Sequence, residues 1–195
     1  FIASVSAIVK SGATPVFADI DSNSQNITAD FVANKISQKT KAILCVHLAG
    51  WPCEMDPIMA LAEQHNLKII EDCAQAHGAE YKGRKVGSLG DVGAFSFQSS
   101  KNLTSGEGGC LLTNDKDIRD RAWAFRDVGR RPGGERWEYP RLGWNYRTSE
   151  YLAGILLTRL THVQGQTELR NQNAAYLSKA LDSTEGLTPP QWRPW

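Results

Sequence analysis

The sequence predicts an α/β protein with a mostly parallel, mixed sheet flanked by helices. Apolar runs of strand length alternate with segments of helical spacing through the first third of the chain. Such strand–helix–strand alternation is typical of right-handed βαβ units on a parallel sheet. Two further strand candidates are then separated by a loop alone, which indicates a local antiparallel pair or a sheet edge.

The first half of the chain supplies three strand candidates and two helix starts. Phe31, Val32 and Ile36 recur at helical spacing after Thr28, and Pro57 stands at the first position after a possible cap. The expected elements are strands at 14–20, 41–47 and 67–72, a helix at 28–37, and a second helix capped by Asp56.

The second half predicts an edge pair followed by helices. The segments "VGAFSFQ" and "GGCLLTN" are short strands, and a helix starts near Asp115 and stops at Gly129. Residues 130–140 combine Gly, Pro and charge, so we expect a mobile loop. The proline-free stretch 149–181 predicts one long helix, or two that join near Gly165.

Composition excludes several classes of function. The 22 Lys and Arg balance 21 Asp and Glu, with no basic stripe for nucleic acid. No apolar run approaches the roughly 18–20 residues of a membrane span, and no export signal is recognisable. The cysteines form no C-x-x-C pair, which argues against a zinc knuckle and favours reduced thiols in a cytoplasmic protein. They are Cys45, Cys53, Cys73 and Cys110.

Candidate chemistry begins at Asp72, which closes the apolar run "LKIIED". Ligands of parallel sheets bind at the carboxyl ends of strands, and a carboxylate beside a dry sheet needs a cationic partner. Gln75 and His77 follow it, among small residues that allow close approach to the backbone. Capping of a turn by Asp72 remains an alternative at this point.

Lys101 is the second candidate, in a polar loop that ends in glycines. A lysine amine can form a Schiff base with an aldehyde, while a carboxylate can keep a pyridine nitrogen protonated. Ser96 lies five positions earlier and offers a hydroxyl to a phosphate. Asp72, Ser96 and Lys101 therefore suggest a pyridoxal phosphate site, with a solvated surface lysine as the alternative.

Three ordered motifs, "EDCAQAHGA", "GDVGAFSFQSSKNLTSGEGG" and "RLGWNYRTSE", resemble the DegT/DnrJ/EryC1/StrS family of pyridoxal-phosphate sugar aminotransferases. The segments "FIASVSAIVKSGATPVFADID" and "VHLAGWPCEMDPI" match as well. The resemblance implies the pyridoxal-phosphate-dependent transferase fold type I, and a fragment that lacks segments at both ends. Residues 1–148 would form part of the large cofactor domain, and 149–195 a helical connection into a truncated small domain.

The resemblance implies roles for six residues. Lys101 would form the Schiff base and move a proton between the substrate Cα and the cofactor. Asp72 would pair with the pyridinium nitrogen, Gln75 would lie near the phenolic oxygen, and Ser96 would bind the phosphate. Phe1 would stack on the ring, and Asn145 would reach the phosphate of the neighbouring subunit in a homodimer with composite sites. No metal is implied, and neither His77 nor the loop 130–136 receives a role.

The activity implied by the resemblance is transfer of an amino group from glutamate or glutamine. The acceptor would be a keto-sugar, often nucleotide-linked, or a cyclitol ketone. A deoxygenating branch of the family carries histidine at the lysine position, so Lys101 argues against that branch. Two alternatives stay open: an enzyme that forms an aromatic amine of the aminohydroxybenzoate type, and a non-catalytic paralogue of the same fold.

Overall fold

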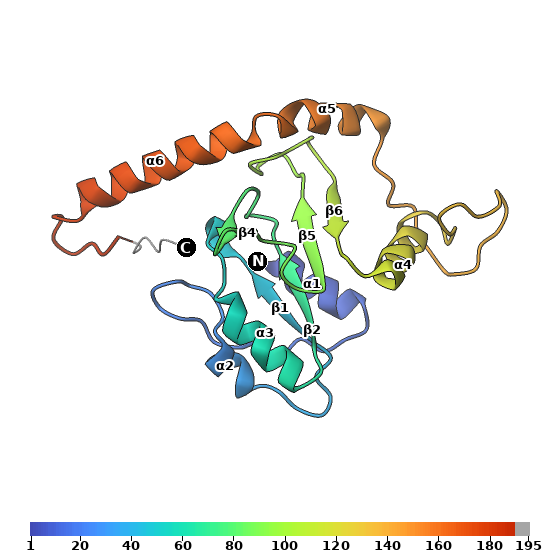
Figure 1. The fold of residues 1–195 in the computed structure, drawn as a ribbon, viewed down its shortest axis with the longest axis horizontal. Helices are drawn as coiled ribbons and strands as arrows, with labels where there is room; N and C mark the ends of the chain where they lie inside the picture. Colours follow the sequence, from blue (N-terminus) through green and yellow to red (C-terminus); the bar gives the residue numbers. More distant parts are fainter. Residues whose placement is uncertain (190–195) are drawn as a thin grey trace.

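The computed structural model describes residues 1–189, and Figure 1 shows how its helices surround a central sheet. The helices are α1 (Ile2–Lys10), α2 (Ala29–Ala33), the 3-10 helix η1 (Leu48–Gly50), α3 (Met55–Gln64), α4 (Lys116–Arg126), α5 (Glu150–Leu160) and α6 (Val163–Leu181). The strands are β1 (Ala42–Val46), β2 (Lys68–Asp72), β3 (Glu80–Tyr81), β4 (Arg84–Lys85), β5 (Val92–Ser96) and β6 (Gly109–Leu112).

The main sheet confirms the predicted mixture of parallel and antiparallel pairing. Its strand order is β1-β2-β5-β6, with β1, β2 and β5 parallel and β6 antiparallel to β5. Asp72 pairs with Val46 on one side and with Ala94 on the other. The carboxyl ends of three strands therefore meet at one edge, which is where the site candidates lie.

Alternating burial along the strands defines the two faces of the sheet. In β1 and β2 every second residue is buried, and these residues pack against α3. The intervening residues face α1, which Figure 1 shows behind the strands. Because side chains alternate along a strand, the consecutive residues Glu71 and Asp72 face opposite sides. The α3 side of the core contains Ile43, Cys45, Met55, Ile58, Ala62, Ile69 and Cys73.

Helix starts were predicted better than helix ends. Thr28, Asp115 and Ser149 each cap a helix with a side-chain oxygen, as their residue types favour. The helix expected at 28–37 ends earlier, at Ala33. The helix expected to begin after Asp56 instead begins at Met55, with Glu54 at the N-cap position.

The long C-terminal helical stretch is two helices, one of the two predicted alternatives. The break falls at residues 161–162 rather than near Gly165, which lies inside α6. No helix within residues 1–189 is both long and apolar enough to cross a membrane.

The strand predicted at 14–20 is wrong. This segment forms only an isolated bridge between Ile20 and Ile27, and Val16 and Phe17 are 67% and 68% exposed. A strand forms only where a neighbour accepts its backbone hydrogen bonds, and none lies beside 14–19 in the described part of the chain. The opening helix α1 was not predicted from its sequence.

A buried carboxylate, Glu71, joins β2 to two separate loops. Its Oε1 accepts hydrogen bonds from the backbone N–H groups of Leu89 (2.8 Å) and Gly90 (2.7 Å), and its Oε2 accepts from that of Gly87 (2.7 Å). His47 Nε2 lies 3.0 Å from the same Oε2. The Cys53 backbone N–H donates to His47 Nδ1, so we assign the ring proton to Nε2, which donates to Glu71.

Hydrogen bonding outweighs burial at Glu71. Burial alone would raise the pKa of this carboxyl, but His47 and three backbone N–H groups lower it below its usual value. Glu71 and His47 are both 0% exposed. If the carboxylate were removed, the groups that donate to it would lose their hydrogen-bond partner.

We predict that Glu71→Gln lowers the free energy of unfolding by about 3 kcal/mol at neutral pH, because an amide N–H₂ would face buried donors. Because the folded-state pKa is depressed, the stabilisation is present above the unfolded pKa and disappears as the pH falls through the folded value. The difference in unfolding free energy between wild type and Glu71→Gln should therefore become smaller below about pH 4. Urea unfolding across pH measures it, with exposed Glu63→Gln as control. A difference that does not change with pH would contradict the lowered pKa of Glu71.

Candidate active site

Asp72 lies at the carboxyl end of β2 and faces α1. Its Oδ2 accepts a hydrogen bond from the Ser4 hydroxyl at 2.7 Å, and its Oδ1 accepts from the Ala74 backbone N–H at 3.1 Å. The carboxylate is half-buried, and no lysine or arginine within residues 1–189 pairs with it. A carboxylate has about four acceptor positions, so Asp72 keeps capacity for a further donor.

Ser96 lies on the same face of the sheet as Asp72. Ala94 is the register partner of Asp72, and Ser96 follows it by two positions along β5, which preserves the side-chain direction. The Ser96 Oγ accepts a hydrogen bond from the Gln98 backbone N–H at 3.3 Å. Its hydroxyl proton stays available at the carboxyl edge of the sheet.

Lys101 occupies a loop whose two ends are bound together. Gln98 bridges to Gly106, and the Lys101 backbone N–H donates to the Gln98 carbonyl at 2.9 Å. The Gln98 side chain accepts from the Ser100 N–H (2.9 Å) and hydroxyl (2.6 Å), and donates to Ser99 Oγ (2.8 Å). Side-chain contacts of one residue thus fix the turn that carries the half-buried lysine.

Gln75 and Phe1 flank the same strand end. Gln75 Oε1 accepts a hydrogen bond from the Ala49 backbone N–H at 2.7 Å, which orients the amide and leaves its N–H₂ group as a donor. Phe1 is the N-cap residue of α1 and is 83% exposed. It stands three positions before Ser4, so the two residues lie on one side of the helix.

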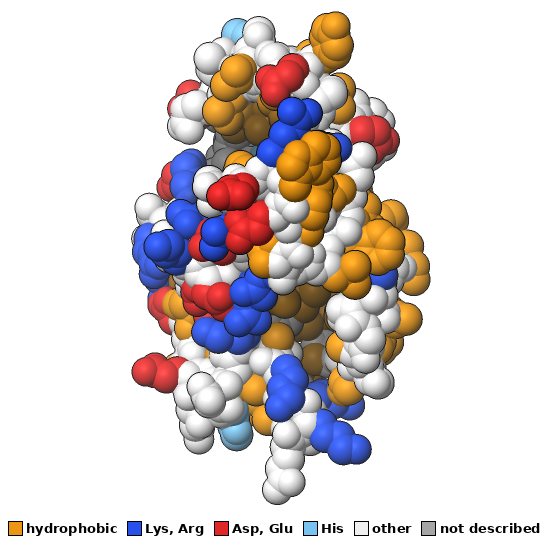
Figure 2. All heavy atoms as spheres, turned by 90° about the vertical axis from the view of Figure 1, so that its right-hand side faces the viewer, with side chains coloured by type: hydrophobic (Ala, Val, Ile, Leu, Met, Phe, Trp, Pro, Cys, Tyr) orange, Lys and Arg blue, Asp and Glu red, His pale blue; other side chains and the backbone are white. Residues whose placement is uncertain are grey.

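Asn145 lies in a separate segment that contacts the C-terminal end of α1. It forms a backbone bridge with Asp127, and its side-chain oxygen accepts from Arg147 Nε at 2.9 Å. Lys10 donates to the Tyr146 hydroxyl at 2.7 Å. Within the described residues Asn145 forms no hydrogen bond with Asp72, Ser96 or Lys101 of its own chain. Figure 2 shows the face that carries this segment, where exposed hydrophobic and basic side chains gather.

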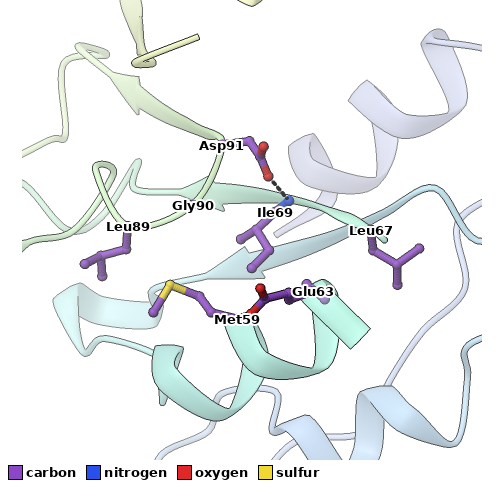
Figure 3. Close-up of a pocket in the computed structure, with 8 residues that line it drawn as sticks. Met59, Glu63, Leu67, Ile69, Leu89, Gly90 and Asp91 are labelled. Atoms are coloured by element: carbon purple, nitrogen blue, oxygen red, sulfur yellow. Dashed lines mark hydrogen bonds between the residues drawn. The ribbon is translucent and has the colours of Figure 1, made fainter. Parts of the chain in front are cut away.

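Two hollows in the structure lie away from Asp72. Figure 3 shows the smaller one, of about 290 Å³, between α3 and the amino end of β2, where Asp91 accepts from the Ile69 N–H. The larger, of about 780 Å³, lies between β5, β6 and α5 and is mainly apolar. Phe95 faces it, and alternation along β5 places Phe95 on the face opposite Ser96. Neither hollow is therefore the candidate site.

His77 lines the larger hollow and stays without an assigned role. It is 6% exposed, and neither ring nitrogen has a hydrogen-bond partner within residues 1–189. Burial lowers the pKa of its imidazole below the usual value; the Ser96 backbone opposes this shift, and the positive charge of Lys101 adds to it. The ring lies tilted against Phe95 and Phe97.

One group of side chains has the residue types of a metal site. Ligand atoms of His47, Glu71 and Cys73 lie within 4.8 Å of one another. Both His47 nitrogens and both Glu71 oxygens already have hydrogen-bond partners, and burial raises the pKa of the Cys73 thiol. A metal would have to displace these bonds, so we interpret the cluster as structural.

The site does fit pyridoxal phosphate. Asp72 is a carboxylate without a cationic partner in the described residues, as a pyridinium N–H requires. Ser96 supplies a hydroxyl on the same face of the sheet, and Lys101 supplies an amine in the loop that follows β5. This combination on a mostly parallel sheet defines the class of pyridoxal-phosphate-dependent aminotransferases. The chain belongs to the DegT/DnrJ/EryC1/StrS aminotransferase family, whose model matches residues 1–195.

Curated relatives in this family act on sugars and cyclitols, by their names. The chain is 42% identical over 183 residues to a GDP-perosamine synthase of Escherichia coli O157:H7, covering 94% of this chain and 50% of the relative. It is 41% identical to the L-glutamine:2-deoxy-scyllo-inosose aminotransferase of Streptoalloteichus tenebrarius, covering 100% and 48%. The chain thus spans about half the length of the curated relatives it matches.

Solved structures show the same fold. An aminotransferase from Psychrobacter cryohalolentis is 46% identical with a TM-score of 0.93, over 98% of this chain and 52% of that chain. DesV of S. venezuelae is 37% identical with a TM-score of 0.94, over 100% and 52%. The family and these neighbours imply pyridoxal phosphate as the cofactor. The predicted fold type I is confirmed, as are the family and the cofactor.

Sequence reasoning missed the residues that position the candidate site. Ser4 contacts Asp72 from 68 positions away, and the Glu71–His47 pair spans 24 positions. A pattern of local spacing carries no signal for such contacts. Glu71 is part of the motif "EDCAQAHGA", but nothing in the motif indicates that its carboxylate is buried and hydrogen-bonded.

We predict that Gln98→Ala loosens the loop around Lys101 without unfolding the sheet. The substitution removes three side-chain hydrogen bonds, each worth about 1 kcal/mol, but leaves the backbone bond to Lys101 in place. Hydrogen exchange of the peptide 98–106 should accelerate severalfold, while the exchange of β2 stays unchanged. Ser99→Ala removes only one of these bonds and serves as the control. Equal exchange in both variants would contradict the role of Gln98.

Proposed function

We propose that the whole protein is an aminotransferase that moves an amino group from glutamate or glutamine to a keto-sugar, of the nucleotide-linked kind implied by the resemblance, or to a cyclitol ketone. The observation that carries this proposal is the placement of Asp72 and Ser96 on one face of the sheet, with Lys101 in the loop that follows β5, in a chain about 40% identical to named sugar and cyclitol enzymes. The four free cysteines fit a reducing, cytoplasmic setting.

The chemistry divides among the residues by their type. Pyridoxal phosphate, when bound, supplies an aldehyde and a ring that withdraws electrons from the substrate Cα. Asp72 would hold the proton on the ring nitrogen, and Ser96 would bind the phosphate through its hydroxyl. Lys101 would hold the cofactor through its amine and would carry the proton at the substrate Cα. Gln75 orients the phenolic oxygen with its amide N–H₂, and Phe1 packs on the ring.

The two alternatives are an enzyme that forms an aromatic amine and a non-catalytic paralogue. A synthase of 3-amino-5-hydroxybenzoic acid shares the fold at 31% identity and a TM-score of 0.93. The higher identity to sugar and cyclitol enzymes favours the proposed acceptors. A non-catalytic paralogue would not need Lys101 and Asp72, and both are present.

The proposal is tested by a screen of amino donors and keto acceptors with the whole protein, read as the change in cofactor absorbance. We predict that wild type responds to glutamate or glutamine and then recovers with a keto-sugar or a cyclitol ketone. Lys101→Ala should lose the lysine-linked absorbance band and the borohydride-fixed peptide, because no other lysine lies in this loop. The exposed Lys85→Ala is the control. A fixed cofactor at this peptide in Lys101→Ala refutes the assignment.

The proposed enzyme is a homodimer in which Asn145 serves the site of the partner. Within the described residues Asn145 forms no hydrogen bond with Asp72, Ser96 or Lys101 of its own chain, which supports this arrangement, as do exposed apolar residues near it in the sequence. Leu142 is 86% exposed, Trp144 51% and Tyr151 88%, which is unusual for large apolar side chains in one surface region. Residues 1–148 then belong to the cofactor domain and 149–195 lead out of it.

Complementation tests the composite site. We predict that Lys101→Ala and Asn145→Ala are each strongly defective, and that co-expression restores activity well above their sum. In a mixed dimer one site receives Lys101 from one chain and Asn145 from the other, and the second site carries both lesions. Up to a quarter of wild-type activity is expected from random pairing. Absence of recovery in purified mixed dimers would place Asn145 within its own site or outside catalysis.

A further inference from the structure

The hydrogen bond from Ser4 to Asp72 is short and joins distant parts of the chain. The distance from Ser4 Oγ to Asp72 Oδ2 is 2.7 Å, within the range of a hydroxyl bonded to an ionised carboxylate. Both residues are half-buried, so solvent competes weakly for either group. The contact spans 68 positions and ties the first turns of α1 to the carboxyl end of β2.

The two oxygens of Asp72 are each held by one donor. Ser4 binds Oδ2 and the Ala74 backbone N–H binds Oδ1, so rotation of the carboxylate about its last bond would break both. The Ala74 N–H belongs to the backbone, so no substitution removes it without moving the end of the strand. The Ser4 hydroxyl belongs to a side chain, so a single substitution removes it. The orientation of Asp72 therefore depends on Ser4 as well as on the Ala74 backbone.

We infer that Ser4 is a positioning residue for the transamination, acting through Asp72. It holds the carboxylate in one orientation, so that Asp72 can keep the ring nitrogen of the cofactor protonated. This inference rests on the proposed function, in which Asp72 is the partner of that nitrogen. Ser4 touches neither substrate nor reacting atoms in this role.

The geometry of α1 supports a role beyond attachment of the helix. Phe1 lies three positions before Ser4, on the same side of the helix, so one helical face presents both an aromatic ring and the donor to Asp72. Ser6 lies two positions on, is exposed, and forms no side-chain hydrogen bond within residues 1–189. These two serines of one helix therefore form a matched pair for substitution.

The test uses the whole enzyme loaded with pyridoxal phosphate labelled with ¹⁵N in the ring, whose chemical shift reports protonation. Ser4→Ala should move this shift toward the unprotonated value and weaken cofactor affinity roughly three- to tenfold, the loss of one charge-assisted hydrogen bond. Ser4→Thr retains the hydroxyl and should restore both values. Ser6→Ala should match wild type. Alanine favours helix more than serine does, so α1 should persist in both variants.

Asp72→Asn separates the two ways in which the inference can fail. If Asp72→Asn moves the ¹⁵N shift and Ser4→Ala does not, the role of Ser4 is overturned and the proposed function stands. If Asp72→Asn also leaves the shift unchanged, Asp72 is not the partner of the ring nitrogen, and both fail together. If Ser4→Ala lowers stability but leaves the ¹⁵N shift unchanged, Ser4 only attaches α1 to β2 and the inference is wrong.

Discussion

The carboxylate of Glu71 is the constraint on which the rest of this structure depends. It has no exposed surface, yet its four hydrogen bonds stabilise the charge inside the sheet–helix interface. Those bonds fix the loop around Gly87 to Gly90 against β2, and through His47 they fix the backbone at Cys53 that leads into α3. The end of β2 is thereby immobilised from one side, which sets the direction of the next residue.

That next residue is Asp72, and its environment differs because it faces the other side of the sheet. Glu71 is surrounded by donors on all sides, whereas Asp72 keeps acceptor capacity after bonding to Ser4 and Ala74. In this strand a structural carboxylate therefore directly precedes the carboxylate that we propose to take part in catalysis. The four hydrogen bonds of Glu71 make the end of β2 rigid, and this rigidity also holds Asp72 in place.

The sequence alone predicted the strands at 41–47 and 67–72, the edge pair and most helix starts, because these depend on local patterns and caps. It failed at 14–20, because strand formation there depends on a neighbour that no local pattern encodes. The positions of Asp72 and Ser96 on one face followed from strand alternation once the register was known. The contacts made by Ser4 and His47 arise from the folded chain and could not have been predicted from spacing.

The closed ends of the loop that carries Lys101 have a consequence for how the chain can change in length. Gln98 bridges to Gly106, and the Ser105 N–H bonds to the Phe97 carbonyl, so residues 99–104 lie outside the ladder of β5 and β6. Insertions or deletions there leave the register of the sheet intact. In β2 a slip of one residue would turn Glu71 and Asp72 to the opposite faces of the sheet. The lysine therefore stands on a loop outside the strand ladder, where Gln98 holds the turn, and the aspartate on a strand whose register is fixed.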